Sequence, residues 1–169
     1  MRCAFRQGSS WCVTGSWSGR GAQITTRLLA ADTVAAPDDV GARLGAAGQV
    51  LRLRRLRLAD GRPVIVQTSH LPAQLAAALD PADLCRRGLY AVLAEHGRAI
   101  GRTSEAITPA ALSARDALDL DRPEASPALL SHQVSFTTAD LPVVDDHALL
   151  AGDSVAITAN RAADHLDVH

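Results

Sequence analysis

The chain has 169 residues, with 17 basic and 18 acidic side chains and a formal net charge of −1. This length suits one domain with a core of its own. The balanced charge and an aromatic content of 3% exclude a nucleic-acid surface built on a basic field or on stacked bases.

No apolar stretch is long enough to span a bilayer, and the N-terminus lacks the apolar segment of a secretory signal. Three cysteines, Cys3, Cys12 and Cys85, are an odd number without metal-like spacing. The pattern therefore predicts a cytoplasmic chain with free thiols and no membrane partner.

Residues 1–22 are rich in Gly, Ser and Arg and have no period of two or 3.6. They are expected to be a poorly ordered tail before a domain at residues 23–169. Ile24–Leu29 is the first predicted strand. Pro37 opens a predicted helix at Asp38–Leu44, which Gly45 ends.

A β-hairpin is predicted within Val50–Pro72, with arms at Leu51–Leu58 and Val64–His70. A two-residue Asp60-Gly61 turn would place Arg55 and Arg57 on the face opposite Gln67. A three-residue loop at Ala59–Gly61 would place all three on one face, and we favour this loop.

The arginines of the first arm fall into two sets. Arg52 and Arg54 alternate with Leu51 and Leu53. Arg55 and Arg57 then occupy the alternate positions that continue the side of the strand on which those leucines lie. The pattern alone favours a solvated or dimer-edge strand. The alternative is an arginine pair at a pocket, placed to bind phosphate or carboxylate.

After the hairpin, two helical segments are predicted: a short one at Pro72–Leu79, and a longer one from Asp80-Pro81 to Gly97. A further helix is expected from Thr108-Pro109 through Ala117. The remaining predicted strands are Ile100–Ile107, Leu129–Phe136, Val143–Ala148 and Val155–Ala159, followed by a polar end at Ala162–His169. Short connections predict an α+β fold, a mainly antiparallel sheet with helices on one face.

Motifs for catalysis or metal binding are absent from the sequence. The histidines at 70, 96, 132 and 147 are scattered, and only His165 and His169 have helical ligand spacing, near the C-terminus. There is no nucleophile elbow and no phosphate-binding loop. We therefore expect no catalytic residue, no metal, no cofactor and no enzyme.

Several runs resemble the UTRA domain, the effector-sensing half of HutC-subfamily, GntR-type bacterial transcription regulators. The most specific is LRLRRLRLADGRPVIVQTSHLP; DPADLCRRGLYAVLAEHGRAIGRTSEAI and ALDLDRPEASPALLSHQVSFTTADLPV support it by order and spacing. The resemblance covers about Gln23 to Asn160. It implies a chorismate-lyase-like fold with an effector between sheet and loops.

The resemblance also implies a ligand site. Its residues are Arg55, Arg57, Gln67, Gly88, Tyr90 and Asp146. The arginines would hold an anion, and Gln67, at a position often acidic in sugar-phosphate sensors, would hold a hydroxyl. Gly88 stands where the family usually has a small hydroxyl residue, and Tyr90 matches an aromatic.

Val144 and Leu150 stand where the family places an acidic and an aromatic residue. Asp146 lies two residues after Val144, which is the next position on the same side of the strand. The implied effector is a small anion, a phosphorylated sugar or a carboxylate.

Three functions follow from the resemblance. The first is a sensing module of a homodimeric regulator, with no direct nucleic-acid binding by this chain, since residues 1–22 contain no winged helix-turn-helix. The second is a degenerate paralogue that only dimerises. The third, a chorismate-lyase-like enzyme, requires a pocket glutamate, for which only Glu105 lies on a suitable strand.

Overall fold

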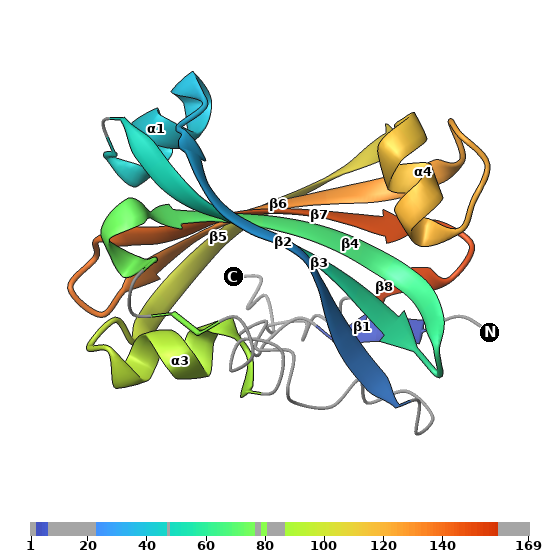
Figure 1. Cartoon of the computed structure of the whole chain (residues 1–169). Coiled ribbons are helices and arrows are strands. Elements are labelled where there is room, and N and C mark those ends of the chain that lie inside the picture. The colour runs from blue at the N-terminus through green and yellow to red at the C-terminus, as the bar shows by residue number, and fades with distance from the viewer. Residues whose placement is uncertain (1–2, 7–22, 47, 77–78, 81–86, 159–169) are drawn as a thin grey trace, which may run out of the picture.

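The computed structural model describes residues 3–6, 23–46, 48–76, 79–80 and 87–158. Their main element is a six-stranded antiparallel sheet in the order β2-β3-β4-β7-β6-β5. In that order the strands are Ile24–Ala35, Gln49–Ala59, Arg62–Pro72, Pro142–Ala151, Pro127–Thr137 and Ile100–Ala111. Figure 1 shows that this sheet is strongly twisted. Such a twist follows from the right-handed twist of each β-strand.

Helices cover both faces of the sheet, so the prediction of helices on one face was wrong. Figure 1 shows α1 (Asp38–Leu44) and α4 (Ala114–Leu120) above the sheet and α3 (Leu89–Glu95) below it. The cause is strand alternation, which gives each face its own apolar set. Leu53 packs with residues of α3, whereas Leu56, whose side chain lies on the opposite face of the sheet, packs with residues of α4.

The β3–β4 hairpin turns at Asp60 and Gly61, with φ of 50° and 79°. Two residues with positive φ form the turn that suits a two-residue hairpin, so the predicted three-residue loop was wrong. However, Leu58 pairs with Pro63 whereas Arg57 pairs with Ile65, which leaves one extra residue on β4. This bulge restores the parity, and Arg55 and Gln67 share a face as predicted.

The helix expected from Thr108-Pro109 was also wrong. β5 continues to Ala111, and Pro109 pairs with Leu129 of β6. A proline is tolerated there because β5 is an edge strand, where one N–H has no ladder partner to lose. Helix α4 begins after Ser113, whose Oγ accepts a hydrogen bond from the Asp116 amide at 3.2 Å.

Other local predictions were confirmed. Helix α1 has the predicted bounds, and Gly45 ends it with a φ of 61°. The helix predicted from Asp80-Pro81 to Gly97 was wrong at Gly88, which has a φ of 83° and is not helical; α3 begins at Leu89 and ends shortly before Gly97, the predicted end, which has a φ of 71°. Its expected opening at Pro81 lies outside the described residues. In the described part of the segment after Pro72, the chain forms a short 3-10 helix, η1 (Ala73–Leu75).

A second, two-stranded sheet pairs β1 (Cys3–Arg6) in parallel with β8 (Val155–Thr158). The sequence predicted β8 but not β1. The rest of residues 1–22 and the polar end at 162–169 lie outside the described residues. Among the helices that the structure describes, none has the length and apolarity required to cross a bilayer.

Candidate functional site

Arg55 and Arg57 lie on the sheet face that α3 covers, and their exposed fractions are 1% and 4%. β3 is an internal strand, flanked by β2 and β4. The interpretation of these arginines as a solvated or dimer-edge set was therefore wrong. Two guanidinium groups in the interior need polar partners, because an uncompensated buried charge is strongly unfavourable.

Arg57 is held by its neighbours on both sides. Its Nη2 and Nε donate to Gln67 Oε1 at 2.9 and 3.3 Å, and its Nη1 donates to Thr26 Oγ1 at 2.9 Å. Gln67 thus orients the guanidinium from β4, while Thr26 does so from β2.

Arg55 belongs to a chain of buried polar groups. Its Nη2 donates to Ser69 Oγ at 2.5 Å and lies 3.9 Å from Asp146 Oδ1. Ser69 in turn donates to Asp146. Burial raises the pKa of the Asp146 carboxyl, against the opposing effect of Arg55 and Ser69.

Further polar side chains continue across β6 on the same face. Ser131, Gln133 and Ser135 are buried, and Gln133 pairs directly with Asp146 across β6 and β7. Ser131 donates to Glu105 Oε1 of β5 at 2.6 Å. The Gln133 amide nitrogen is buried and has no hydrogen-bond partner in the described structure. We call the set formed by Arg55, Arg57, Gln67, Ser69, Asp146, Ser131, Gln133 and Ser135 the polar row.

Helix α3 brings the last two predicted site residues to this face. Tyr90 Oη lies 2.6 Å from Ser135 Oγ, so Tyr90 adjoins the β6 end of the polar row. Gly88 is buried at the start of α3 with a φ of 83°, a conformation that favours glycine. Val144 and Leu150 are buried apolar residues that flank Asp146 on β7.

The structure therefore brings together Arg55, Arg57, Gln67 and Asp146, with Tyr90 next to them through Ser135. Sequence reasoning missed Ser69 and the β6 residues. The signal for the latter was present as the alternation Ser131, Gln133, Ser135, which places three polar side chains on one face of a strand.

Arg52 and Arg54 point to the opposite face, as the alternation predicted. Arg52 forms a bidentate pair with Asp32 at 2.6 and 3.0 Å. Arg54 Nη2 contacts Asp116 and Asp119 of α4 at 2.8 and 2.6 Å. These contacts tie β3 to β2 and to α4, so their role is structural.

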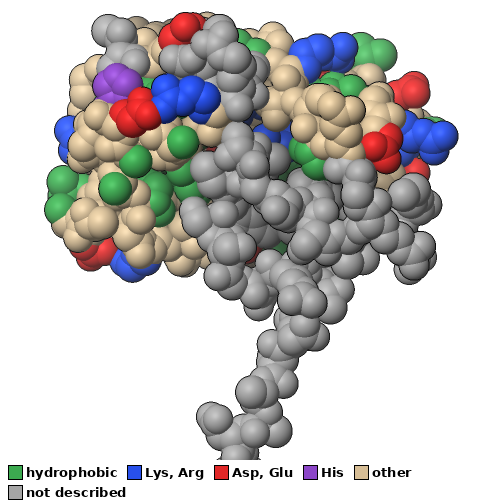
Figure 2. All heavy atoms as spheres, turned by 90° about the horizontal axis from the view of Figure 1, so that it is seen from below, with side chains coloured by type: hydrophobic (Ala, Val, Ile, Leu, Met, Phe, Trp, Pro, Cys, Tyr) green, Lys and Arg blue, Asp and Glu red, His purple; other side chains and the backbone are tan. Residues whose placement is uncertain are grey.

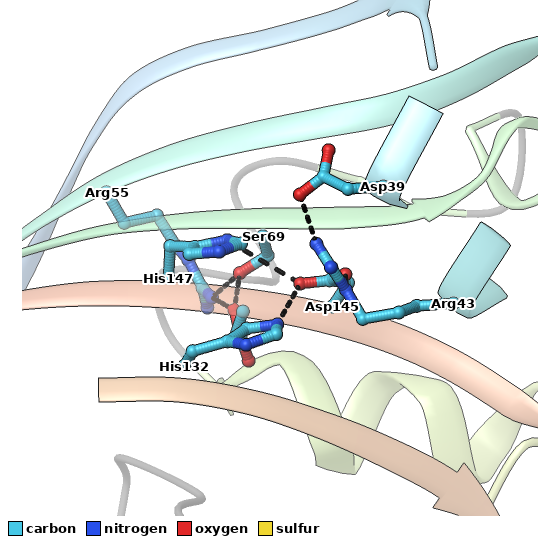
Figure 3. A network of polar contacts seen from close by, with 8 residues as sticks. Asp39, Arg43, Arg55, Ser69, His132, Asp145 and His147 are labelled. Atoms are coloured by element: carbon cyan, nitrogen blue, oxygen red, sulfur yellow. Dashed lines mark hydrogen bonds and ion pairs between the residues drawn. The ribbon is translucent and has the colours of Figure 1, made fainter. Parts of the chain in front are cut away.

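A group of possible metal ligands lies on this opposite face. Asp145, His132 and His147 each offer a ligand atom, and these atoms all lie within 4.8 Å of one another. Figure 3 shows the two imidazoles and the carboxylate converging beside Arg43 of α1. The histidines come from different strands, so no sequence motif marked them.

A separate hollow of about 330 Å³ lies near α1, η1 and the β6–β7 connection. Its lining is largely apolar, and Arg98 is its charged residue. It does not include the arginine pair. Among the coloured side chains of Figure 2, acidic and basic residues are mixed rather than gathered in one basic patch.

Comparison with known proteins places these features in a family. A family model for the UTRA domain matches residues 19–156. The chain is 34% identical over 131 residues to the HTH-type transcriptional repressor PhnF of Mycolicibacterium smegmatis strain ATCC 700084. That match covers 78% of this chain and 52% of the repressor, so the chain spans about half the length of this curated relative.

Solved structures show the same similarity. The effector domain of PhnF from Mycobacterium smegmatis superposes with a TM-score of 0.81 and 28% identity, covering 94% of this chain and all of that one. The ligand-binding domain of a candidate GntR-family regulator from Bordetella bronchiseptica gives a TM-score of 0.74 at 25% identity, covering 81% of this chain and 88% of that one.

Proposed function

The chain belongs to the UTRA domain family, and from this premise we propose that its polar row binds a small anionic effector. The family and its structural relatives make the chain an effector-binding domain of the GntR-type transcription regulators. Domains of this kind bind small molecules and usually form dimers. The identity of the effector and the use of particular residues are the proposal.

The polar row is the observation that carries this proposal. A sheet face under a helix ordinarily buries apolar side chains, whereas this one buries two arginines, a carboxylate, a glutamine and three serines. Each buried polar group that lacks a partner costs about 1–3 kcal/mol. Most groups of the polar row are hydrogen-bonded to one another, whereas the Gln133 amide nitrogen has no partner among the described residues and marks a position where a ligand acceptor would fit.

Arg55 and Arg57 supply the anion contact. They have the same parity on β3, so their backbones are about 7 Å apart, and long side chains from such positions can converge on one anion. Hydrogen bonds to a charged group contribute roughly 1.5–3 kcal/mol each. Gln67 holds the Arg57 guanidinium, and this pre-orientation reduces the cost of ordering it on binding.

Asp146 and Tyr90 set the polarity of the rest of the ligand. The Asp146 carboxylate accepts hydrogen bonds and repels a second anionic group, so the uncharged part of the effector faces β7 and β6. Gly88 contributes backbone rather than a hydroxyl. This arrangement suits a phosphorylated sugar or a hydroxylated carboxylate.

We also assign the site to sensing rather than catalysis, and the chain to a cytoplasmic homodimer. The relatives with this fold are transcription regulators, and the polar row contains no nucleophile with an adjacent histidine base. β2 and β5 are the edge strands of the sheet, which makes them the strands available for pairing with a second copy.

The test is a thermal-shift screen of phosphorylated sugars and small carboxylates, followed by titration of a hit against single variants. Arg57→Ala should weaken binding about tenfold or more, which corresponds to the loss of one charge-assisted contact. Arg52→Ala is the matched control, since it removes an arginine of the same strand from the opposite face.

A hit that binds Arg57→Ala, Arg55→Ala and Arg52→Ala equally well would show that the arginine assignment is wrong. If no anion stabilises the parent chain, the result would favour the alternative function, a degenerate paralogue that only dimerises.

A further inference from the structure

The sheet face opposite the polar row holds a second polar group. His132 of β6 and His147 of β7 are cross-strand partners, and their rings stack with centroids 4.3 Å apart and an interplanar angle of 7°. His132 Nε2 lies 3.0 Å and His147 Nδ1 lies 3.5 Å from the same oxygen, Asp145 Oδ1. Three potential ligand atoms thus face one point (Figure 3).

We propose that His132, His147 and Asp145 form a binding site for a divalent transition-metal ion such as Zn²⁺. Two imidazole nitrogens and one carboxylate oxygen are a donor set that zinc accepts in proteins. A tetrahedral ion with ligands at about 2.0–2.2 Å separates those ligand atoms by about 3.5 Å. The three atoms already lie within 4.8 Å of one another, so side-chain rotations close the difference.

Helix α1 orients the carboxylate for this role. Arg43 Nε donates to Asp145 Oδ2 at 2.5 Å, and Arg43 Nη2 contacts Asp39 at 2.7 Å. The arginine therefore occupies one carboxylate oxygen and leaves the other toward the histidines. Partners that fix a ligating group in this way are common behind metal sites.

The local charge also favours a cation. Asp39 and Asp145 carry two negative charges and Arg43 carries one positive charge, so with neutral imidazoles the group is left with one net negative charge. Asp145 is fully buried, and a buried carboxylate gains most from a nearby cation. His132 and His147 keep side-chain exposures of 28% and 33%, which leaves a route for the ion and a position for a water ligand.

The site is independent of the polar row. Asp145 and Asp146 are adjacent on β7, so their side chains point to opposite faces of the sheet. His70, directly across from Asp145 on β4, adds a buried Nδ1 that has no hydrogen-bond partner in the described part of the chain. Among the described residues, this face therefore has an imidazole nitrogen, His70 Nδ1, that no hydrogen bond uses and that could serve as a further metal ligand.

The experiment is a calorimetric titration of the full chain with Zn²⁺ under reducing conditions. We expect one ion per chain at this site and at least tenfold weaker binding in His147→Gln. Asp145→Asn should abolish binding, but it also removes the negative partner of Arg43 in α1. His147→Gln is therefore the decisive variant, because its side chain is 33% exposed.

Two controls separate this site from other zinc ligands. His96→Gln changes an exposed histidine at the end of α3 and should leave binding unchanged. A parent with His165→Ala and His169→Ala removes the spaced pair near the C-terminus and should still bind one ion. No binding by the parent, equal binding by His147→Gln, or loss of binding with the C-terminal pair would each overturn the proposal.

Discussion

The buried pair of Arg55 and Asp146 allows a quantitative test of how the polar row is held. In Arg55→Gln the guanidinium is lost, while the Asp146 carboxylate stays in a site where it is 4% exposed. Removing one partner of a buried ion pair typically costs about 3–5 kcal/mol. Solvent screening gives no discount here, because Arg55 itself is 1% exposed. For a chain of this size the loss corresponds to a decrease in Tm of about 6–20 °C.

The cost should depend on pH in a defined direction. Burial raises the pKa of the Asp146 carboxyl from its ordinary value of 3.8, so the folded chain binds this proton more tightly than the unfolded chain. The stability gained in this way is full below the ordinary pKa and is lost as the pH rises through the raised pKa. Without Arg55 the pKa rises further, and Arg55→Gln should therefore cost less at about pH 5 than at about pH 8.

The assay is urea unfolding of four chains: the parent, Arg55→Gln, Asp146→Asn and the double variant. Removing both charges leaves no uncompensated charge at this pair of sites, so we expect the double variant to be more stable than the sum of the single effects, by about 1–3 kcal/mol. Arg102→Gln is the control, because it removes an exposed ion pair with Asp140 and a cation–π contact with Phe136, which together should be worth less than about 2 kcal/mol. If Arg55→Gln costs no more than this control, or if the two single effects add, the buried pair does not hold the row.

Three further predictions concern the scaffold. Ser113→Ala should destabilise the chain by about 1 kcal/mol in urea unfolding, because Ser113 caps α4, and Ser113→Asp should restore the cap. Gly152→Ala should cost about 1–3 kcal/mol in the same assay, because an added Cβ would lie 2.8 Å from the Pro127 carbonyl oxygen, which belongs to the backbone and cannot rotate away; a cost near zero would show that the β7 end shifts freely. Light scattering at high protein concentration should give twice the chain mass, and a monomer mass would contradict the proposed homodimer.

The sequence by itself determined the features that depend on neighbouring residues. Helix α1 formed where Pro37 and Gly45 placed its ends, since both residues act through their own backbone angles. The two parities of arginine on β3 followed from the two-residue period of a strand. Arg55 and Gln67 share a face as expected, but for a reason the sequence did not show: a bulge in β4 compensated for a turn that is shorter than predicted.

The tertiary structure alone decided which strands lie side by side and therefore which side chains meet. Thr108-Pro109 has the local pattern of a helix start, yet pairing with β6 kept it extended, because a full ladder of sheet hydrogen bonds outweighs a weak local preference. Asp146 reached Arg55, and His132 reached His147, only because β7 lies between β4 and β6. Such contacts join residues far apart in the sequence, and their register is set by the packing of the whole sheet rather than by any local pattern.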